Sequence, residues 1–264
     1  MRLRYYALAV IALIALAFIY GFAVEPYWIE YTAHKIEMPV KRSYTVLQLS
    51  DLHLRDFGQR EREIVKHTEA LKPDIIALTG DLVSSEPRAD EIARFVKQLR
   101  SNLGVFVIMG NWEHWRPSEL IPKLESIPNV HVLINSSFQI ANDLTIIGMD
   151  DDLAGKPNEE LAFATVDYKS ARLLLFHSPI AFAMVKKPYD LALAGHTHGG
   201  QIKLPLLPPP MVPPGSADFV SGFYEREGRR MYVSRGIGTS VIPMRFFARP
   251  EVARFELIPP NLTR

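Results

Sequence analysis

Short runs of apolar and β-branched residues recur along the chain from Lys41 onward, and they predict buried strands. The runs occupy residues 44–49, 75–79, 105–109, 131–134, 144–148, 172–176, 191–194, 231–234 and 252–257. Helical patterns fall between several of them, at residues 60–71, 90–100, 118–126 and 180–186. Because helices alternate with strands early in the chain and strands dominate later, we expect an α/β sandwich with mixed sheets.

The N-terminal segment follows a different pattern, because residues 5–24 carry no charge. About twenty apolar residues in a helix cross the hydrocarbon core of a bilayer, so we expect a membrane anchor over residues 1–24. A cleaved signal peptide is the alternative, since Gly21-Phe22-Ala23 is an acceptable cleavage sequence, although the apolar run is long for one. Pro26 and Pro39 punctuate an expected linker over residues 25–40, and residues 41–264 are expected to form one domain.

Charges beside the apolar segment indicate how it would cross a membrane. Arg2 and Arg4 precede it, whereas Glu25 and Glu30 follow it closely. Because positively charged flanks tend to stay in the cytoplasm, we expect a single-pass protein whose domain lies on the extracytoplasmic side.

The amino-acid composition excludes several kinds of site and partner. The chain has no cysteine, which excludes disulfides, zinc fingers, iron–sulfur clusters and cysteine nucleophiles. Its 30 basic and 29 acidic residues leave a formal net charge of +1, and nothing resembles the basic stripe of a nucleic-acid-binding protein. We therefore expect no nucleic-acid partner.

Polar side chains follow five of the predicted strands, at the edge where open α/β sheets place their ligands. They are Asp51-Leu52-His53, Gly80-Asp81, Gly110-Asn111, His177 and Gly195-His196-Thr197-His198-Gly199-Gly200. Carboxylate, amide and imidazole groups suit manganese, iron or zinc. In Asp-x-His and His-x-His, both side chains project to the same side of an extended segment and can reach one metal cluster. Each motif alone is typical of a helix cap or a structural histidine, but together they predict a metal centre.

In order and spacing, these motifs resemble those of the calcineurin-like metallophosphoesterase family, over nearly all of residues 44–257. The resemblance implies an αββα sandwich of two mixed sheets flanked by helices. It also implies two divalent metal ions, one bound by Asp51, His53 and His198, the other by Asn111, His177 and His196, with Asp81 bridging the two. Two cations lower the pKa of a bound water and clamp phosphoryl oxygens, so such an enzyme would hydrolyse a phosphate ester or pyrophosphate bond with metal-bound hydroxide.

Three further segments, at residues 195–201, 204–215 and 233–240, are similar to a membrane-associated branch of that family. This branch is similar to the enzymes that cleave UDP-2,3-diacylglucosamine, which implies a lipid-linked substrate and the bilayer as a partner. Two alternatives stay open: a tethered phosphoesterase for soluble phosphomonoesters or diesters, and a non-catalytic metal-binding module. Residues 204–215 contain six prolines, so they form either a packed surface loop or a lip that contacts membrane or acyl chains.

One position departs from the family pattern, in which a histidine commonly follows the metal-binding asparagine. Here that position is Trp112. His114 could take over the role and is therefore grouped with Asp81 and Asn111 as a catalytic candidate. Alternatively, the leaving group needs no protonation, as in a phosphoanhydride, or catalysis is impaired. Arg235 and Arg245 are candidates for binding substrate phosphate, with surface salt bridging as an equal alternative.

Overall fold

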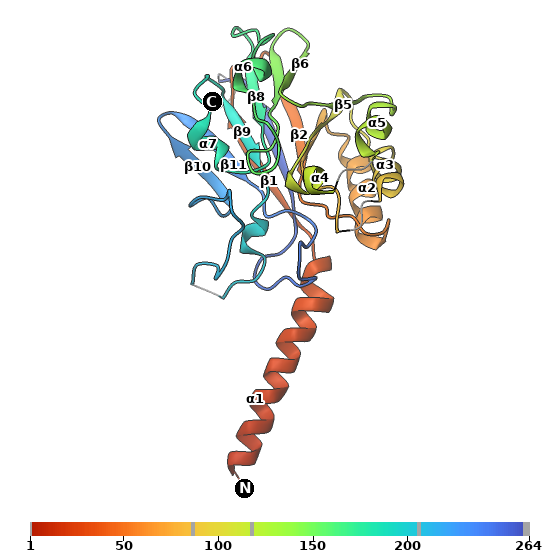
Figure 1. Ribbon diagram of the computed structural model, residues 1–264, viewed down its shortest axis with the longest axis vertical. Coiled ribbons are helices and arrows are strands. Elements are labelled where there is room, and N and C mark those ends of the chain that lie inside the picture. The colour runs from red at the N-terminus through yellow and green to blue at the C-terminus, as the bar shows by residue number, and fades with distance from the viewer. Residues whose placement is uncertain (1, 86–87, 117–118, 205–206, 261–264) are drawn as a thin grey trace.

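Two six-stranded sheets form the centre of the protein, whose structure is a computed structural model describing residues 2–85, 88–116, 119–204 and 207–260 (Figure 1). The strands of the first sheet, in spatial order, are β1 (Glu30–Glu37), β12 (Glu251–Ile258), β2 (Tyr44–Leu49), β3 (Ile75–Thr79), β4 (Gly104–Ile108) and β5 (Val130–Val132). Those of the second sheet are β10 (Gly222–Arg226), β11 (Arg229–Val233), β9 (Leu191–Ala194), β8 (Ala171–Leu175), β7 (Leu144–Gly148) and β6 (Ser136–Ile140). Both sheets mix parallel and antiparallel neighbours, which confirms the predicted sandwich of mixed sheets.

Apolar side chains fill three layers, one between the sheets and one on the outer face of each. Adjacent residues of a strand point to opposite faces, so Val46 packs between the sheets while Leu47 packs outward under the helices. The helices over the first sheet are α2 (Gln59–Leu71), α3 (Ala89–Val96) and α5 (Leu120–Glu125), whereas α6 (Glu159–Ala162) and α7 (Ala181–Met184) pack on the second. Because both faces of each sheet are covered, the central strands are continuous apolar runs rather than alternating ones.

Four predicted helices correspond to α2, α3, α5 and α7, although α3 and α7 are shorter than expected. The predicted start of α5 at Ser118 lies outside the described residues. Three strands were not predicted: β1, β6 and β10. Each lies at the edge of its sheet, where polar and apolar residues alternate and no continuous apolar run forms.

The segment expected to be a linker, residues 25–40, belongs to the first sheet instead. Its residues Glu30–Glu37 form β1, which pairs in parallel with β12 from Glu251 to Ile258. The prediction of a linker is therefore wrong for this strand, because an edge strand that is half-exposed resembles a loop in its polarity. As a result, the chain enters the first sheet at residue 30.

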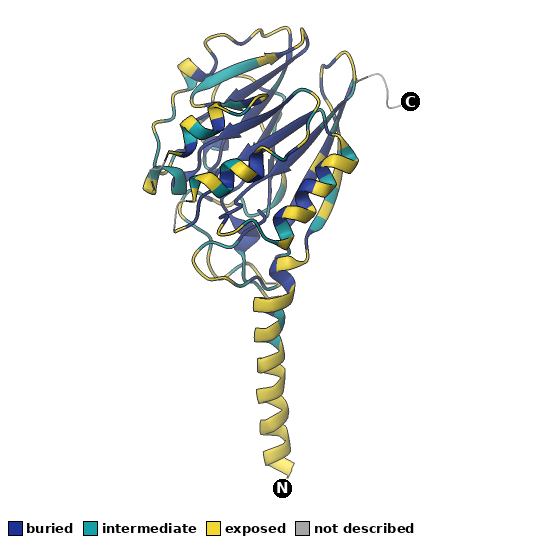
Figure 2. Cartoon of the chain, turned by 90° about the vertical axis from the view of Figure 1, so that its right-hand side faces the viewer, coloured by how far each residue is buried: buried dark blue, intermediate teal, exposed yellow. Residues whose placement is uncertain are grey.

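The helix α1 (Arg2–Ile19) projects away from the two sheets and has no buried residue (Figure 2). A π-helical turn, Tyr20–Val24, and a 3-10 turn, Glu25–Tyr27, continue it toward β1. By length and composition, Arg2–Tyr27 is able to cross a membrane, a test that a signal sequence also passes.

Candidate metal centre

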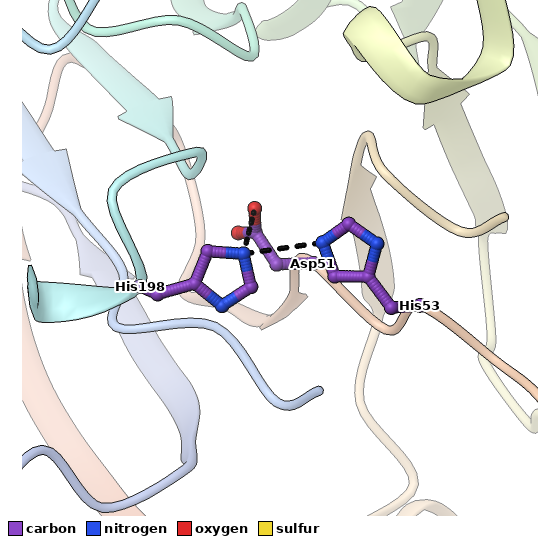
Figure 3. A group of neighbouring side chains, drawn as sticks. All are labelled: Asp51, His53 and His198. Atoms are coloured by element: carbon purple, nitrogen blue, oxygen red, sulfur yellow. Dashed lines mark hydrogen bonds and ion pairs between the residues drawn. The ribbon is translucent and has the colours of Figure 1, made fainter. Parts of the chain in front are cut away.

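Six buried side chains form two neighbouring groups of possible metal ligands. One group is Asp51, His53 and His198, and the other is Asp81, His177 and His196. Within each group, one ligand atom from each residue lies within 4.8 Å of the others, which is close enough for a shared ion. Figure 3 shows His53 and His198 on either side of Asp51, with the Nε2 atoms of the two rings 3.1 Å apart.

Asp81 belongs to the second group and also lies close to the first. Its Oδ2 atom is 3.2 Å from Nε2 of His177 in its own group and 3.7 Å from Nε2 of His53 in the other. Its Oδ1 atom accepts a hydrogen bond from the backbone N–H of Trp112 at 2.9 Å. The carboxylate is therefore within reach of both groups, which is the position that the resemblance implies for a bridging ligand.

Strands of both sheets bring these residues to one place. Asp51 and His53 follow β2, Asp81 follows β3 and Asn111 follows β4 in the first sheet, while His177 follows β8 and both His196 and His198 follow β9 in the second. The segments after β2 and β3 are paired, because His53 N donates to Asp81 O and Asp51 N donates to Gly80 O, each at 3.0 Å. The centre thus lies where the carboxyl ends of two sheets meet.

Several residues of the centre have a strained backbone. The φ angles in the left-handed region are 52° at Asp51, 40° at His53, 54° at Asp81, 73° at His196 and 52° at His198. This region costs a residue other than glycine about 1–2 kcal/mol, and it persists where the surroundings hold it, often at functional sites. Gly195 permits the close packing, because a Cβ atom there would collide with the side chains of Ser50 and Asp51.

Backbone carbonyls determine which imidazole nitrogen faces the centre. Nδ1 of His53 lies 3.0 Å from Val83 O, and Nδ1 of His177 lies 2.8 Å from Thr79 O. A carbonyl only accepts, so each Nδ1 carries a proton, and Nε2 is the ring nitrogen that faces the centre. His196 has the reverse arrangement: its Nε2 donates to the carbonyl of Pro214 at 2.6 Å, so Nδ1 is the nitrogen that could bind a metal ion.

Burial keeps two of the imidazoles neutral. Desolvation lowers the pKa of His53 to about 4, and desolvation together with the neighbouring His53 lowers the pKa of His198 well below its usual value. Both rings are therefore uncharged at pH 7, the form that binds a metal. Asp81 stays ionised, because the charge and hydrogen bond of His177 outweigh burial and lower its pKa to about 2.

Asn111 indicates that the centre fits metal ions. Its side chain is buried, and within the part of the chain that the structure describes, its Oδ1 atom has no hydrogen-bond partner. An unsatisfied buried oxygen costs about 1–3 kcal/mol, which a coordinated cation would offset. The surrounding donors are carboxylates and imidazoles, and this set together with an amide oxygen suits manganese, iron or zinc.

A family model described as calcineurin-like phosphoesterase matches residues 44–200, a range that contains every ligand candidate above. The chain belongs to the calcineurin-like phosphoesterase family. This family is dinuclear and metal-dependent, and the two groups of ligands correspond to two ions. The protein is accordingly a metal-dependent phosphohydrolase.

Relatives of this calcineurin-like phosphoesterase match it over most of its length. It is 29% identical to the metallophosphoesterase YkuE of Bacillus subtilis over 255 residues, covering 90% of this chain and 89% of the relative. It is 30% identical to the phosphodiesterase YaeI of Escherichia coli over 251 residues, covering 89% and 90%. The structure of the NAD nucleotidase NadN of Haemophilus influenzae shares the fold, with a TM-score of 0.50 and 15% identity over 74% of this chain and 45% of that one.

Glu113 is a residue of the centre that the sequence analysis missed. Its half-buried side chain accepts hydrogen bonds from four backbone N–H groups, those of Asp81, Leu82, Val83 and Gly110, at 2.7 to 2.9 Å. Burial and the neighbouring Asp81 raise the pKa of Glu113 to about 7. It stands three residues after Gly110 at the start of α4 (Asn111–Trp115), the position of a helix-capping glutamate, and this spacing was the available signal.

A largely apolar cavity of about 410 Å³ adjoins the metal centre. Asp81, Asn111 and His196 line its inner end. The indole rings of Trp112 and Trp115, 6.1 Å apart, form part of its wall. Trp112, which replaces the usual histidine of the family, also meets the ring of His53 edge-on at 5.4 Å. The position at which the family resemblance implies a proton donor therefore carries part of an apolar wall here.

The structure corrects the prediction that Arg235 and Arg245 bind substrate phosphate. Arg245 is completely buried and donates to the backbone carbonyls of Gly238, Ala248 and Arg235 at 2.7 to 2.9 Å. Arg235 pairs with Glu30 at 3.0 Å, at the start of β1. Neither arginine lines the cavity, because each is held by contacts within the fold.

Proposed function

We propose that this chain hydrolyses a phosphate ester or pyrophosphate bond at a centre of two manganese, iron or zinc ions. In this proposal Asp51, His53 and His198 hold one ion, Asn111, His177 and His196 hold the other, and Asp81 contacts both. The observation that carries it is the pair of buried ligand groups with Asp81 in reach of each. Ions bound there supply Lewis-acid activation of water and neutralise charge on the phosphoryl oxygens.

The chain's own residues set the charge of this centre. Two aspartates offset half of the charge of two divalent cations, and Asn111 adds a neutral ligand, so the loaded centre is positive and attracts an anionic phosphate. The backbone N–H of Trp112 holds Asp81 in place at 2.9 Å. The apolar cavity excludes water around the reacting phosphate, which strengthens these interactions.

His114 is our candidate for protonating the leaving group. It lies one helical turn after Asn111, and its Nε2 is 2.7 Å from Oδ1 of Asp150, which orients the ring. We expect His114→Gln to lower kcat/KM about 10²-fold for an alkyl phosphodiester, the range of general-acid catalysis, and to have little effect on a p-nitrophenyl ester. Equal effects on both substrates would exclude the role, and His67→Gln on α2 is the matched control.

We further propose that α1 anchors the enzyme in a membrane and that the substrate is lipid-linked, as UDP-2,3-diacylglucosamine is. The exposed apolar helix and the apolar cavity beside the centre support this proposal. Arg2 and Arg4, in the first turn of the helix and before its uncharged stretch, favour a domain outside the cytoplasm, which protease accessibility in sealed spheroplasts would test.

A comparison of substrates tests this proposal directly. The purified full chain with manganese is expected to have a kcat/KM about tenfold or more higher for an acylated phosphodiester or pyrophosphate in mixed micelles than for its deacylated counterpart. Burying as much apolar surface as one large side chain carries stabilises binding by a free energy that corresponds to about this factor. Equal values for the acylated and deacylated substrates would favour the alternative, a tethered phosphoesterase for soluble esters.

A further inference from the structure

The membrane-spanning candidate is joined to the domain by specific contacts rather than by a flexible tether. The backbone carbonyl of Gly21 accepts a hydrogen bond from Arg245 N at 2.9 Å. The carboxylate of Glu25, which is completely buried, accepts from the backbone N–H groups of Phe247 and Ala248. The end of α1 is therefore attached to the loop of residues 238–248 and is not free to swivel about the domain.

Two loops, residues 199–217 and 238–248, lie at the end of the domain from which α1 leaves (Figure 1). Their described residues expose large apolar side chains. We call six of them the apolar rim: Leu204, Leu207, Met211, Val241, Ile242 and Phe247. Met211 and Val241 are about four-fifths exposed, at 79% and 81%. Apolar groups gathered in this way on a water-facing surface are unfavourable unless another apolar phase covers them.

The loops of the rim are also nearly free of charge. Residues 199–217 and 238–248 contain two charged residues, Lys203 and Arg245, and Arg245 is completely buried. Tyr27 and Trp28, just after the apolar helix, are exposed beside the same loops, as aromatic residues at a membrane interface are. A bilayer is thus the occupant that matches the surface, because the helix that would enter it leaves the domain beside the loop of residues 238–248.

The cavity connects this surface with the metal centre. Met211, Val241 and Ile242 of the apolar rim line it, and so do Asp81, Asn111 and His196 of the centre. Its volume of about 410 Å³ falls within the usual range for a small-molecule site. An amphiphile with its apolar part in the bilayer could therefore place a phosphate at the centre without leaving the membrane surface.

We infer that the catalytic domain lies face-down on the bilayer, with the apolar rim inserted in the leaflet and the cavity open toward it. This inference deepens the proposed function and rests on α1 being a membrane anchor. It adds that the substrate enters laterally from the lipid phase, past a lip formed by residues 207–215, the described part of the proline-rich segment that follows Leu204. Pro205 and Leu206 of that segment lie outside the described residues.

Site-specific fluorescence tests the depth of the apolar rim, and the absence of native cysteine makes single labels possible. Val241→Cys and Met211→Cys in the full chain would carry an environment-sensitive dye in nanodiscs with brominated lipids. The control is Leu161→Cys, because Leu161 is 60% exposed. It belongs to α6, a helix at the opposite end of the domain from α1 (Figure 1). We expect about half of the fluorescence at 241 and 211 to be quenched, as for groups 5–10 Å deep, and none at 161.

The same degree of fluorescence quenching at positions 241, 211 and 161 would overturn the inference. So would efficient crosslinking between chains through the thiol introduced by Val241→Cys in place of quenching, because a second copy would then cover the apolar rim. This readout needs no turnover, so it stands even if the enzyme hydrolyses no lipid. Loss of lipid hydrolysis with intact quenching would instead count against the proposed substrate.

A turnover experiment tests the lateral entry. Leu204→Asp and Leu207→Asp place charges in the apolar rim at positions that do not line the cavity. We expect each to lower kcat/KM about tenfold for a lipid phosphodiester in vesicles, because an aspartate is unfavourable at membrane depth, and to leave a water-soluble diester unaffected. Leu161→Asp is the control. Unchanged lipid hydrolysis, or equal loss with both substrates, would contradict lateral entry.

Discussion

Asp81→Asn is expected to lower kcat/KM for a phosphodiester about 10³-fold, the scale lost when a main charge-stabilising group is removed. Asp81 has an oxygen 3.2 Å from His177 and 3.7 Å from His53, so it serves both ligand groups. An amide offers one weaker oxygen ligand and a donor that repels a cation. Bound manganese measured by mass spectrometry should fall below the two ions per chain expected for the native protein.

Asp90→Asn is the matched control, because Asp90 is an exposed residue on α3 whose carboxylate pairs with Lys123. It should retain full activity and metal content. Unchanged hydrolysis by Asp81→Asn would sink both the two-metal mechanism and the ligand assignment.

Glu113→Gln is expected to destabilise the protein by about 2–6 kcal/mol without removing a metal ligand. The carboxylate receives two backbone N–H groups on each oxygen. Whichever way the amide is oriented, its NH₂ group faces two of these donors and leaves them unsatisfied, at about 1–3 kcal/mol each. Denaturant unfolding at pH 8, above the pKa of about 7 of this carboxyl, would measure the loss.

Glu119→Gln, at an exposed position just before α5, should leave the unfolding midpoint unchanged. If Glu113→Gln were equally silent, the four hydrogen bonds could not be holding the segments after β3 and β4 together. If Glu113→Gln loses activity at temperatures where it stays folded, the loss would indicate that Asp81 has moved, because the backbone N–H of Asp81 is one of the four donors to Glu113.

The central strands and the ligand motifs were predictable because each follows from local chemistry. A strand covered on both faces is mostly apolar along its length, and β2, β3, β8 and β9 all show this pattern. The carboxyl ends of these strands carry the Asp and His residues, and the end of β4 carries Asn111. The edge strand β1 was mistaken for a linker, because half of its side chains meet solvent and its pattern resembles a loop.

The arginines show why side-chain roles need the fold. Nothing in the sequence distinguishes Arg245, which is buried among backbone carbonyls, from an exposed arginine available to a phosphate. Glu113 was missed for the related reason that three of its four partners, residues 81–83, are some thirty residues earlier in the chain. Such contacts arise when β3 and β4 lie side by side.

By itself, the sequence determined that a set of metal-binding side chains follows parallel strands and that an apolar segment precedes them, since residue type and local periodicity encode both. The family resemblance implied two groups of ligands with Asp81 between them, and the structure brings these side chains together. Only the tertiary structure decided that Trp112 faces an apolar cavity, and that Gly21 and Glu25 attach the segment after α1 to a loop that lines this cavity. These features depend on segments up to 223 residues apart, which hydrophobic burial brings together and no local pattern records.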